Sequence, residues 1–324
     1  MRRRGQGFFD NFRNILGYAE RTRPDLVVHG GDLFFRRRIP PKIVDMVYEA
    51  LLEFSEAGIP MFIVPGNHEG SRLPASLWLE AASLHVFDRP RTFHVEVSGQ
   101  VVAISGFPFV RADAGVKFAE MVAETGWQDT AAPIRILCMH QAVDGAQFGP
   151  ANYTFRAGRD VVSLPDIPED FSVVLTGHIH RRQVLTASRG KGAPPIIYAG
   201  SIERTSFSEK DEPKGFFEIC LGMDENGRWT ANDITFRELP TRPMVEVSIG
   251  PEIDASGLRA YLEQSISGAD QDSIVKLRSR WAPDPSVRAR LTAPFLRSVF
   301  PPSMNVQLGA EFYRDARPVE HARQ

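Results

Sequence analysis

The stretch Leu26-Val27-Val28-His29-Gly30-Gly31-Asp32 decides how this chain folds. It is a short apolar run, typical of a buried strand, that ends in two glycines and a carboxylate. Three more apolar runs end on groups of the same kind: Asn67 and His68, His140, and His178 and His180. Polar side chains that follow successive buried strands gather at one rim of an α/β sheet. The sequence therefore predicts an α/β fold with these groups in one pocket.

Helices are predicted on both sides of the first strand. Apolar residues recur at helical spacing from Phe8 to Ala19, and again from Ile43 to Phe54 behind Pro40-Pro41. The order helix, strand, helix, strand is typical of an α/β fold. From about Thr92 the pattern changes to short strands and turns, so we expect sheets packed between helices up to about residue 238.

The segment from Leu239 to Pro243 predicts a domain boundary, with one domain over residues 1–240 and a smaller one over residues 241–324. The smaller domain is predicted to be α+β. Its expected strands are Met244 to Ile249, Ile274 to Trp281 and Asn305 to Leu308, and its expected helices are Ser256 to Ser265 and Val287 to Val299.

Composition excludes some classes of protein. The 324 residues carry a net charge of −2, so only local basic patches would favour nucleic acid. No stretch approaches the roughly 18–20 apolar residues of a membrane span, and we expect a cytoplasmic protein. Cys138 and Cys220 lie within apolar runs and are predicted to be buried free thiols.

The polar groups predict a metal centre. A carboxylate, an amide oxygen and imidazoles suit Mn²⁺, Fe²⁺ or Zn²⁺, and a close pair of such ions can break phosphate esters. Asp32 is the candidate bridging ligand and Asn67 a ligand through its amide oxygen, while His68 can act on the phosphate or the leaving group. His178 and His180 project to the same side of an extended segment, so each can contact a different ion. Taken alone, Asp32 could instead cap a turn and His140 could be a core histidine.

In this order the motifs resemble the calcineurin-like metallophosphoesterase superfamily. Residues 30–35 and 64–69 resemble the second and third motifs of the SbcD family of DNA-repair nucleases, and residues 198–204, 206–207 and 214–216 resemble the strand and loop that follow its histidine pair. The resemblance covers roughly residues 7–240. It implies a metallophosphoesterase β-sandwich flanked by helices, with a small α+β domain similar in position and size to the family's DNA-capping domain.

The resemblance also implies roles. Asp32 would bridge two ions, Asn67, His140 and His178 would hold one of them, and His180 would help to hold the other, with His68 acting on the phosphate. The family's usual ion is Mn²⁺, and its substrate is DNA in double-strand break repair. Its nuclease subunit dimerises and works with an SbcC-like coiled-coil ABC ATPase.

One departure from the family pattern affects the expected activity. The superfamily begins with a strand that ends in Asp-X-His, which supplies two ligands to the first metal, and no such motif stands in the N-terminal region here. We therefore expect the first metal site to be incomplete and hydrolysis to be impaired. Two other functions remain open: a phosphomonoesterase or small-molecule phosphodiesterase with the same metal core, and a non-catalytic DNA-binding subunit.

Basic and aromatic residues near the predicted pocket have two interpretations each. Arg36, Arg37 and Arg38 follow the Asp32 motif, and Arg181 and Arg182 follow His180; these residues either contact phosphate or form solvated loops. Tyr153 and Phe155 lie in the loop after His140 and either stack on bases or anchor that loop. Lys276, Arg278 and Arg280 alternate on a predicted strand and would give the smaller domain one basic face.

Overall fold

The computed structural model describes residues 4–36, 38–70, 73, 81–149, 152–185, 193–281 and 284–313. The chain divides into two compact units, residues 9–240 and residues 241–324 together with residues 1–8. Both units combine helices with sheets, so the predicted α/β class is confirmed.

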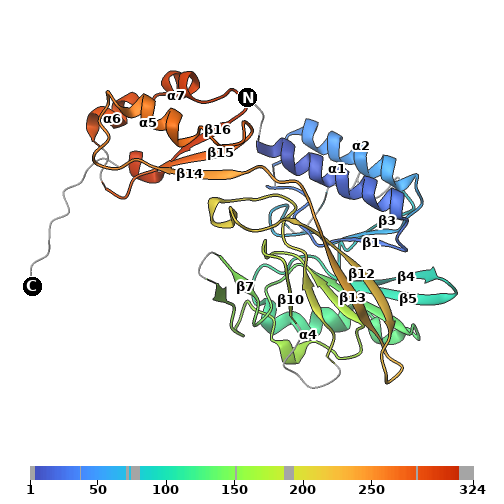
Figure 1. Cartoon of the computed structure of the whole chain (residues 1–324). Coiled ribbons are helices and arrows are strands. Elements are labelled where there is room, and N and C mark those ends of the chain that lie inside the picture. The colour runs from blue at the N-terminus through green and yellow to red at the C-terminus, as the bar shows by residue number, and fades with distance from the viewer. Residues whose placement is uncertain are drawn as a thin grey trace, which may run out of the picture. The chain divides into compact units, whose positions relative to one another are not determined.

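Three parallel strands form the first sheet of residues 9–240. They are β1 (Val27–His29), β2 (Met61–Ile63) and β3 (Leu84–Val86), in that order. Helices α1 (Arg4–Thr22) and α2 (Pro41–Ser55) run along one side of this sheet (Figure 1). Their buried residues, among them Leu16, Leu51 and Phe54, pack against Ile63 of β2. The predicted apolar stripe of the second helix is confirmed except at Ile43, whose side chain is exposed.

Six strands form the second sheet, in the order β10-β11-β9-β6-β5-β4. Their bounds are β4 (Arg91–Val97), β5 (Gln100–Gly106), β6 (Ile134–Met139), β9 (Val173–Thr176), β10 (Gln183–Leu185) and β11 (Ile196–Tyr198). The four central strands are parallel and the two edge strands are antiparallel to their neighbours. Helix α4 (Ala114–Glu124) packs on the outer face, where its Phe118 and Val122 share a core with Leu137 and Met139.

A long hairpin lies in the same layer as the first sheet. Its strands are β12 (Gly215–Met223) and β13 (Trp229–Glu238). On one face Phe216 contacts Tyr18 of α1 with ring centroids 5.1 Å apart, and on the other Phe217 joins an apolar core that includes Phe62 and Ile136 from the two sheets. Two sheets therefore face each other with helices outside, and the expected β-sandwich flanked by helices is confirmed.

The strand period explains one wrong prediction. Successive residues of a strand point to opposite faces, and Ile219 and Leu221 of β12 point into the apolar core. Cys220 between them is exposed, whereas we had expected it to be buried. Cys138 is buried as predicted, and both cysteines are free thiols.

Three parallel strands and three helices make up the described part of residues 241–324. The strands, in the order β14-β15-β16, are β14 (Met244–Ser248), β15 (Ile274–Arg278) and β16 (Asn305–Leu308); the helices are α5 (Leu258–Ser265), α6 (Pro285–Arg290) and α7 (Ala293–Val299). One helix had been expected where α6 and α7 stand. The chain breaks because Thr292 caps α7, accepting a hydrogen bond from Phe295 N at 3.4 Å, and Pro294 follows directly.

The predicted basic strand face is smaller than expected. Strand β15 ends at Arg278, so Arg280 lies beyond it. Arg278 forms an ion pair with Glu246 at 3.1 Å, which offsets part of its charge. The remaining short elements among the described residues are β7 (Gln147–Phe148), β8 (Tyr153–Thr154) and the 3-10 turns Trp127–Asp129, Leu164–Asp166, Phe207–Glu209 and Ala310–Phe312. Among the described residues, no helix combines the length and apolar character needed to cross a membrane.

Candidate metal centre

Four of the predicted ligands meet at the carboxyl ends of strands from both sheets. Asp32 follows β1, Asn67 follows β2, His140 follows β6 and His178 follows β9. Asn67 Oδ1 lies 3.0 Å from His140 Nε2 and 3.0 Å from His178 Nδ1. His140 Nε2 is also 3.3 Å from Asp32 Oδ2. Residues that are distant in the sequence therefore present their donor atoms to one small volume.

The backbone is shaped to let these groups approach. Gly31 has φ +107°, and a Cβ at this position would overlap the His140 ring. A Cβ on Gly66 would overlap the Asp32 carboxylate in the same way. Asp32 and His178 themselves adopt left-handed φ angles of 56° and 77°. Such conformations cost about 1–3 kcal/mol each and cluster at functional sites.

The hydrogen bonds of His140 orient its ring for a ligand role. Its Nδ1 donates to Gly30 O at 2.7 Å, so Nε2 is the ring nitrogen left to bind a ligand. This Nε2 faces two oxygen atoms, Asn67 Oδ1 and Asp32 Oδ2. A cation between these three atoms would be attracted by all of them.

The electrostatics of the cluster keep its ligands in the form that binds metal. Burial raises the pKa of Asp32, but the hydrogen bond to His140 and the charges nearby lower it further, to about 2. Burial, followed by the neighbouring His140, lowers the pKa of His178 to about 4. At neutral pH the pocket therefore offers a carboxylate and an unprotonated imidazole.

The donor set fits a divalent cation. Ligands held about 2.1 Å from one ion lie roughly 3 Å apart around it, which is the spacing found here. Within the described part of the chain, His, Cys, Asp and Glu alone form no group of three placed as metal ligands. The set is completed by the amide oxygen of Asn67, because both histidines contact that atom.

His68 lies beside this donor set. Its backbone N–H donates to Asp32 Oδ1 at 3.0 Å, while its ring Nε2 is 3.8 Å from Asp32 Oδ2. The side chain is 41% exposed, so it can reach a bound substrate. The exposed ring of Phe35 stacks on it at 5.9 Å. Glu69 joins the two loops, because its Oε1 accepts from Leu33 N and Gly66 N.

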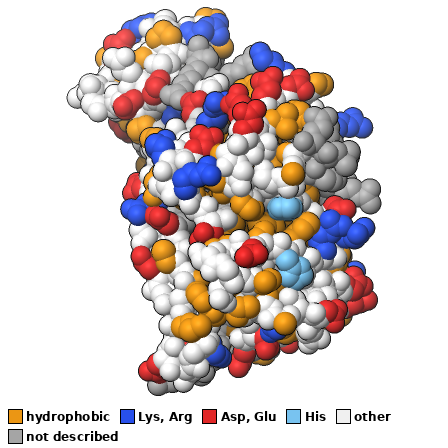
Figure 2. All heavy atoms as spheres, turned by 90° about the vertical axis from the view of Figure 1, so that its right-hand side faces the viewer, with side chains coloured by type: hydrophobic (Ala, Val, Ile, Leu, Met, Phe, Trp, Pro, Cys, Tyr) orange, Lys and Arg blue, Asp and Glu red, His pale blue; other side chains and the backbone are white. Residues whose placement is uncertain are grey.

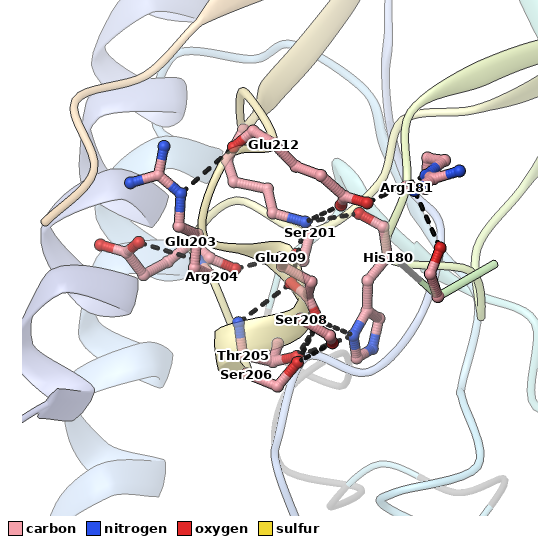
Figure 3. A network of polar contacts seen from close by, with 12 residues as sticks. His180, Arg181, Ser201, Glu203, Arg204, Thr205, Ser206, Ser208, Glu209 and Glu212 are labelled. Atoms are coloured by element: carbon pink, nitrogen blue, oxygen red, sulfur yellow. Dashed lines mark hydrogen bonds and ion pairs between the residues drawn. The ribbon is translucent and has the colours of Figure 1, made fainter. Parts of the chain in front are cut away.

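His180 belongs to a second cluster. Its Nδ1 contacts Thr205 Oγ1 at 2.9 Å and Glu209 Oε1 at 3.2 Å, and Figure 3 shows the ring pointing toward these residues. Burial raises the pKa of Glu209, but hydrogen bonds from His180, Lys214 and Thr205 outweigh this and hold that pKa well below its usual range. Glu209 is therefore ionised and accepts the Nδ1 proton, which leaves Nε2 as the ligand atom of His180.

A buried lysine completes the second cluster. Lys214 is 2% exposed, and its Nζ contacts Glu209 Oε2 at 2.8 Å, Glu212 Oε2 at 3.0 Å and His180 O at 2.8 Å. The two carboxylates thus share one cation inside the protein. This network joins the His180 loop to the turn at Phe207–Glu209.

Sequence reasoning gave no role to three residues of these clusters. Phe109 stacks on His178 at 5.5 Å and meets His140 edge-on at 5.8 Å, and no motif marked it. Lys214 lies in a segment noted only for its family likeness, and Glu209 lies outside the quoted motifs. A carboxylate and a lysine five residues apart in an otherwise polar loop were the available signal.

The predicted arginines have different surroundings. Arg36 and Arg38 are exposed in the loop after Asp32, and Arg37 lies outside the described residues. Arg181 donates to Glu212 Oε1 at 2.9 Å, Asn152 Oδ1 at 2.5 Å and Gly149 O at 2.9 Å. Arg182 stacks over Phe236 at 4.2 Å. Phosphate contact by Arg36, Arg38 and Arg181 stays a prediction.

Comparison with known proteins gives related sequences. The profile of the calcineurin-like phosphoesterase family matches residues 5–182. The DNA double-strand break repair protein Mre11 of Methanococcus maripaludis is 27% identical over 71% of this chain and 60% of its own length. The protein of the same name from Thermoplasma acidophilum is 27% identical over 82% of this chain and 67% of its own length.

Some of these matches are partial. The chain spans about half to two-thirds of the length of the curated relatives that it matches. A solved structure of a hypothetical protein from Thermus thermophilus aligns with a TM-score of 0.42 and 14% identity, over 72% of this chain and 94% of that one.

Proposed function

We propose that this chain, which belongs to the calcineurin-like phosphoesterase family, is a metal-dependent phosphodiesterase acting on DNA in double-strand break repair. The observation that carries the proposal is the meeting of Asp32, Asn67, His140 and His178 within 3.0–3.3 Å contacts at the rim of two sheets. The relatives named for DNA repair support the choice of DNA as substrate.

The family implies divalent metal ions, and the four residues are the ones that would hold one of them. When bound, the ion supplies Lewis-acid stabilisation of the charge that develops on the phosphate. The ring of His140 is kept in the required tautomer by Gly30 O. Mn²⁺ is the proposed ion, because carboxylate, amide and imidazole donors suit it. His180, oriented by Glu209, is the proposed ligand for the other ion. The site of that other ion is incomplete in this proposal, so hydrolysis is expected to be impaired.

The proposed role of His68 is proton transfer. Its exposed ring stands next to the donor set without taking part in it, at 3.8 Å from Asp32 Oδ2. From there the ring can contact a phosphate oxygen or protonate the leaving alkoxide, a role worth about 10²–10⁴-fold in rate. Arg36 and Arg38, whose side chains are exposed in the loop after Asp32, are the proposed contacts with the DNA backbone.

The finer parts of the proposal follow the family. Residues 1–240 are the proposed nuclease domain and residues 241–324, which have their own apolar core, the proposed capping domain. A cytoplasmic location, an SbcC-like ATPase partner and a homodimer are part of the same proposal.

An assay of two substrates tests the proposed activity. With Mn²⁺, linear duplex DNA should be degraded, and His68→Ala should lower kcat by about 10²–10⁴-fold while bound Mn²⁺ stays unchanged. His94→Gln, at an exposed histidine, is the control. Hydrolysis of p-nitrophenyl phosphate alone would show a phosphomonoesterase. DNA binding without hydrolysis would show a non-catalytic subunit.

A further inference from the structure

A cavity of about 340 Å³ opens beside the metal centre. His178 and His180 line it, together with Phe148 and Phe155 and the carboxylates of Glu209 and Glu212. Its size falls within the roughly 300–1,000 Å³ of small-ligand sites. Since the two histidines border both the cavity and the candidate metal centre, a group in the cavity can belong to the same molecule as a phosphate at the metal.

One wall of the cavity is aromatic. The rings of Phe148 and Phe155 are stacked with centroids 4.4 Å apart. Phe155 is partly buried and packs against the core, whereas Phe148 keeps 41% of its surface exposed. The space-filling view in Figure 2 shows surface histidines next to hydrophobic side chains on one face of the molecule. A flat aromatic ligand could extend this stack.

The aromatic wall is held in place by the protein alone. Arg181 donates to Gly149 O next to Phe148, and its Nε is fixed by Glu212 at 2.9 Å. Gln147 N donates to Gln183 Oε1 at 2.8 Å, and Phe155 N donates to Ala146 O at 2.8 Å. The platform is therefore formed before a ligand arrives, which lowers the entropy cost of binding.

The charges of the cavity decide the class of ligand. Glu209 and Glu212 line it, and the cations nearest to them, Lys214 and Arg181, are already paired with these carboxylates. No surplus positive charge faces the cavity among its described lining residues, so a second phosphate is disfavoured. Carboxylate oxygens accept from N–H groups, and nucleobases combine a flat ring with amino donors on its edge.

We propose that this cavity is a subsite for an unpaired nucleobase whose attached phosphate lies at the metal centre, with Phe148 as the stacking platform. The inference rests on the proposed function and specifies its substrate. A base inside a duplex cannot enter a side cavity without leaving its stack, so the subsite takes frayed ends or single strands. Stacking on one aromatic side chain is worth about 1–3 kcal/mol per base.

Binding without metal tests the subsite separately from catalysis. The probe is a short single-stranded oligonucleotide with a terminal 2-aminopurine, titrated with protein in EDTA. We expect its fluorescence to be quenched on binding, and Phe148→Ala to raise Kd by about 5- to 150-fold. Tyr153→Ala is the matched control, because Tyr153 is exposed on the same hairpin but does not line the cavity. Absence of quenching, or equal losses in the two variants, would overturn the subsite.

An abasic substrate gives the second test. With Mn²⁺, Phe148→Ala should lower kcat/KM about 5- to 150-fold on the intact oligonucleotide and have no further effect when the terminal base is removed. An equal loss on both substrates would overturn the subsite while leaving the nuclease proposal intact. Quenching by the wild-type protein without hydrolysis of either oligonucleotide would support the subsite and refute the nuclease.

Discussion

His178 and His180 stand two residues apart, yet their rings have different partners. His178 contacts the amide oxygen of Asn67 and stacks on Phe109, and burial lowers its pKa to about 4. His180 contacts the ionised Glu209, which shares the buried cation of Lys214. The first histidine belongs to the cluster of candidate ligands with Asp32, Asn67 and His140, and the second to a cluster in which Lys214 and Arg181 balance the charges of Glu209 and Glu212.

The difference shows how one short segment can supply two kinds of ligand. A neutral imidazole among acceptors can bind a cation with little competition from protons. An imidazole that donates to a carboxylate becomes more basic at its other nitrogen and is fixed in orientation. The two environments are compatible with the expectation that the histidines serve different ions, which remains a prediction.

Removing each histidine in turn should give the largest contrast. We expect His178→Ala to lower hydrolysis by at least about a thousandfold, because an ion supplies several kcal/mol of transition-state stabilisation. The affinity for the tightest-bound Mn²⁺ should fall as well, because one of its ligands is removed. His180→Ala should leave the affinity for that ion unchanged. Titration of Mn²⁺ by calorimetry checks this, and an equal fall in affinity for the same ion in both variants would remove the distinction.

Removing Lys214 from its cluster with Glu209 and Glu212 should mainly affect the stability of the folded protein. Lys214→Met leaves Glu209 without its lysine partner, while Glu212 keeps Arg181, and we expect the free energy of unfolding to fall by about 3–5 kcal/mol. Lys117→Met, at an exposed ion pair with Asp113, should change it by less than about 1 kcal/mol. Urea unfolding of the metal-free proteins measures both. Similar values for the two variants would show that the Lys214 network is not a buried ion cluster.

The cluster of Asp32, Asn67, His140 and His178 should make the stability of the metal-free protein sensitive to acid. The folded-state pKa of His178, about 4, lies below its ordinary 6.5, so the unfolded chain binds more protons between these values. Stability is therefore complete above pH 6.5 and falls as pH drops toward 4, by up to about 3 kcal/mol from this residue. His178→Gln should flatten the curve and His94→Gln should not, as followed by urea unfolding in EDTA. A curve unchanged by His178→Gln would contradict the assignment.

The smallest effect is expected when the negative charge of Glu209, which orients His180, is removed. Glu209→Gln keeps the shape but removes the charge, and we expect a loss of about 10- to 100-fold in affinity for the second ion or in kcat. Glu212→Gln serves as the control, because Glu212 pairs with the same Lys214 but does not contact His180. A shift in the pH profile of kcat confined to Glu209→Gln separates positioning from general destabilisation.

Much of the first cluster could be predicted from the sequence. Asp32, Asn67 and His140 each follow an apolar run, and the ends of strands meet at a sheet rim regardless of their distance in the chain. The surroundings of His180 could not be predicted in this way. They depend on Glu209 and Lys214 in a loop whose path is set by tertiary contacts, and on the left-handed backbone at His178, which no residue type announces.

Errors elsewhere had local causes. Cys220 lies in an apolar run, but the strand period turns it outward between Ile219 and Leu221. The helix expected from Val287 to Val299 is two helices, since Thr292 and Pro294 start a new one. Both predictions relied on apolar composition. The exposure of Cys220 was decided by the alternation of side chains along a strand, and the division of the helix by the capping residue Thr292.

The central claim is that Asp32, Asn67, His140 and His178 hold one divalent ion. Electron spin echo spectroscopy of the first equivalent of bound Mn²⁺ detects coordinated imidazole nitrogens directly. The account predicts nitrogen couplings from two histidines, reduced to one in His140→Ala or His178→Ala and unchanged in His180→Ala. A spectrum without imidazole couplings, or one that only His180→Ala alters, would contradict it.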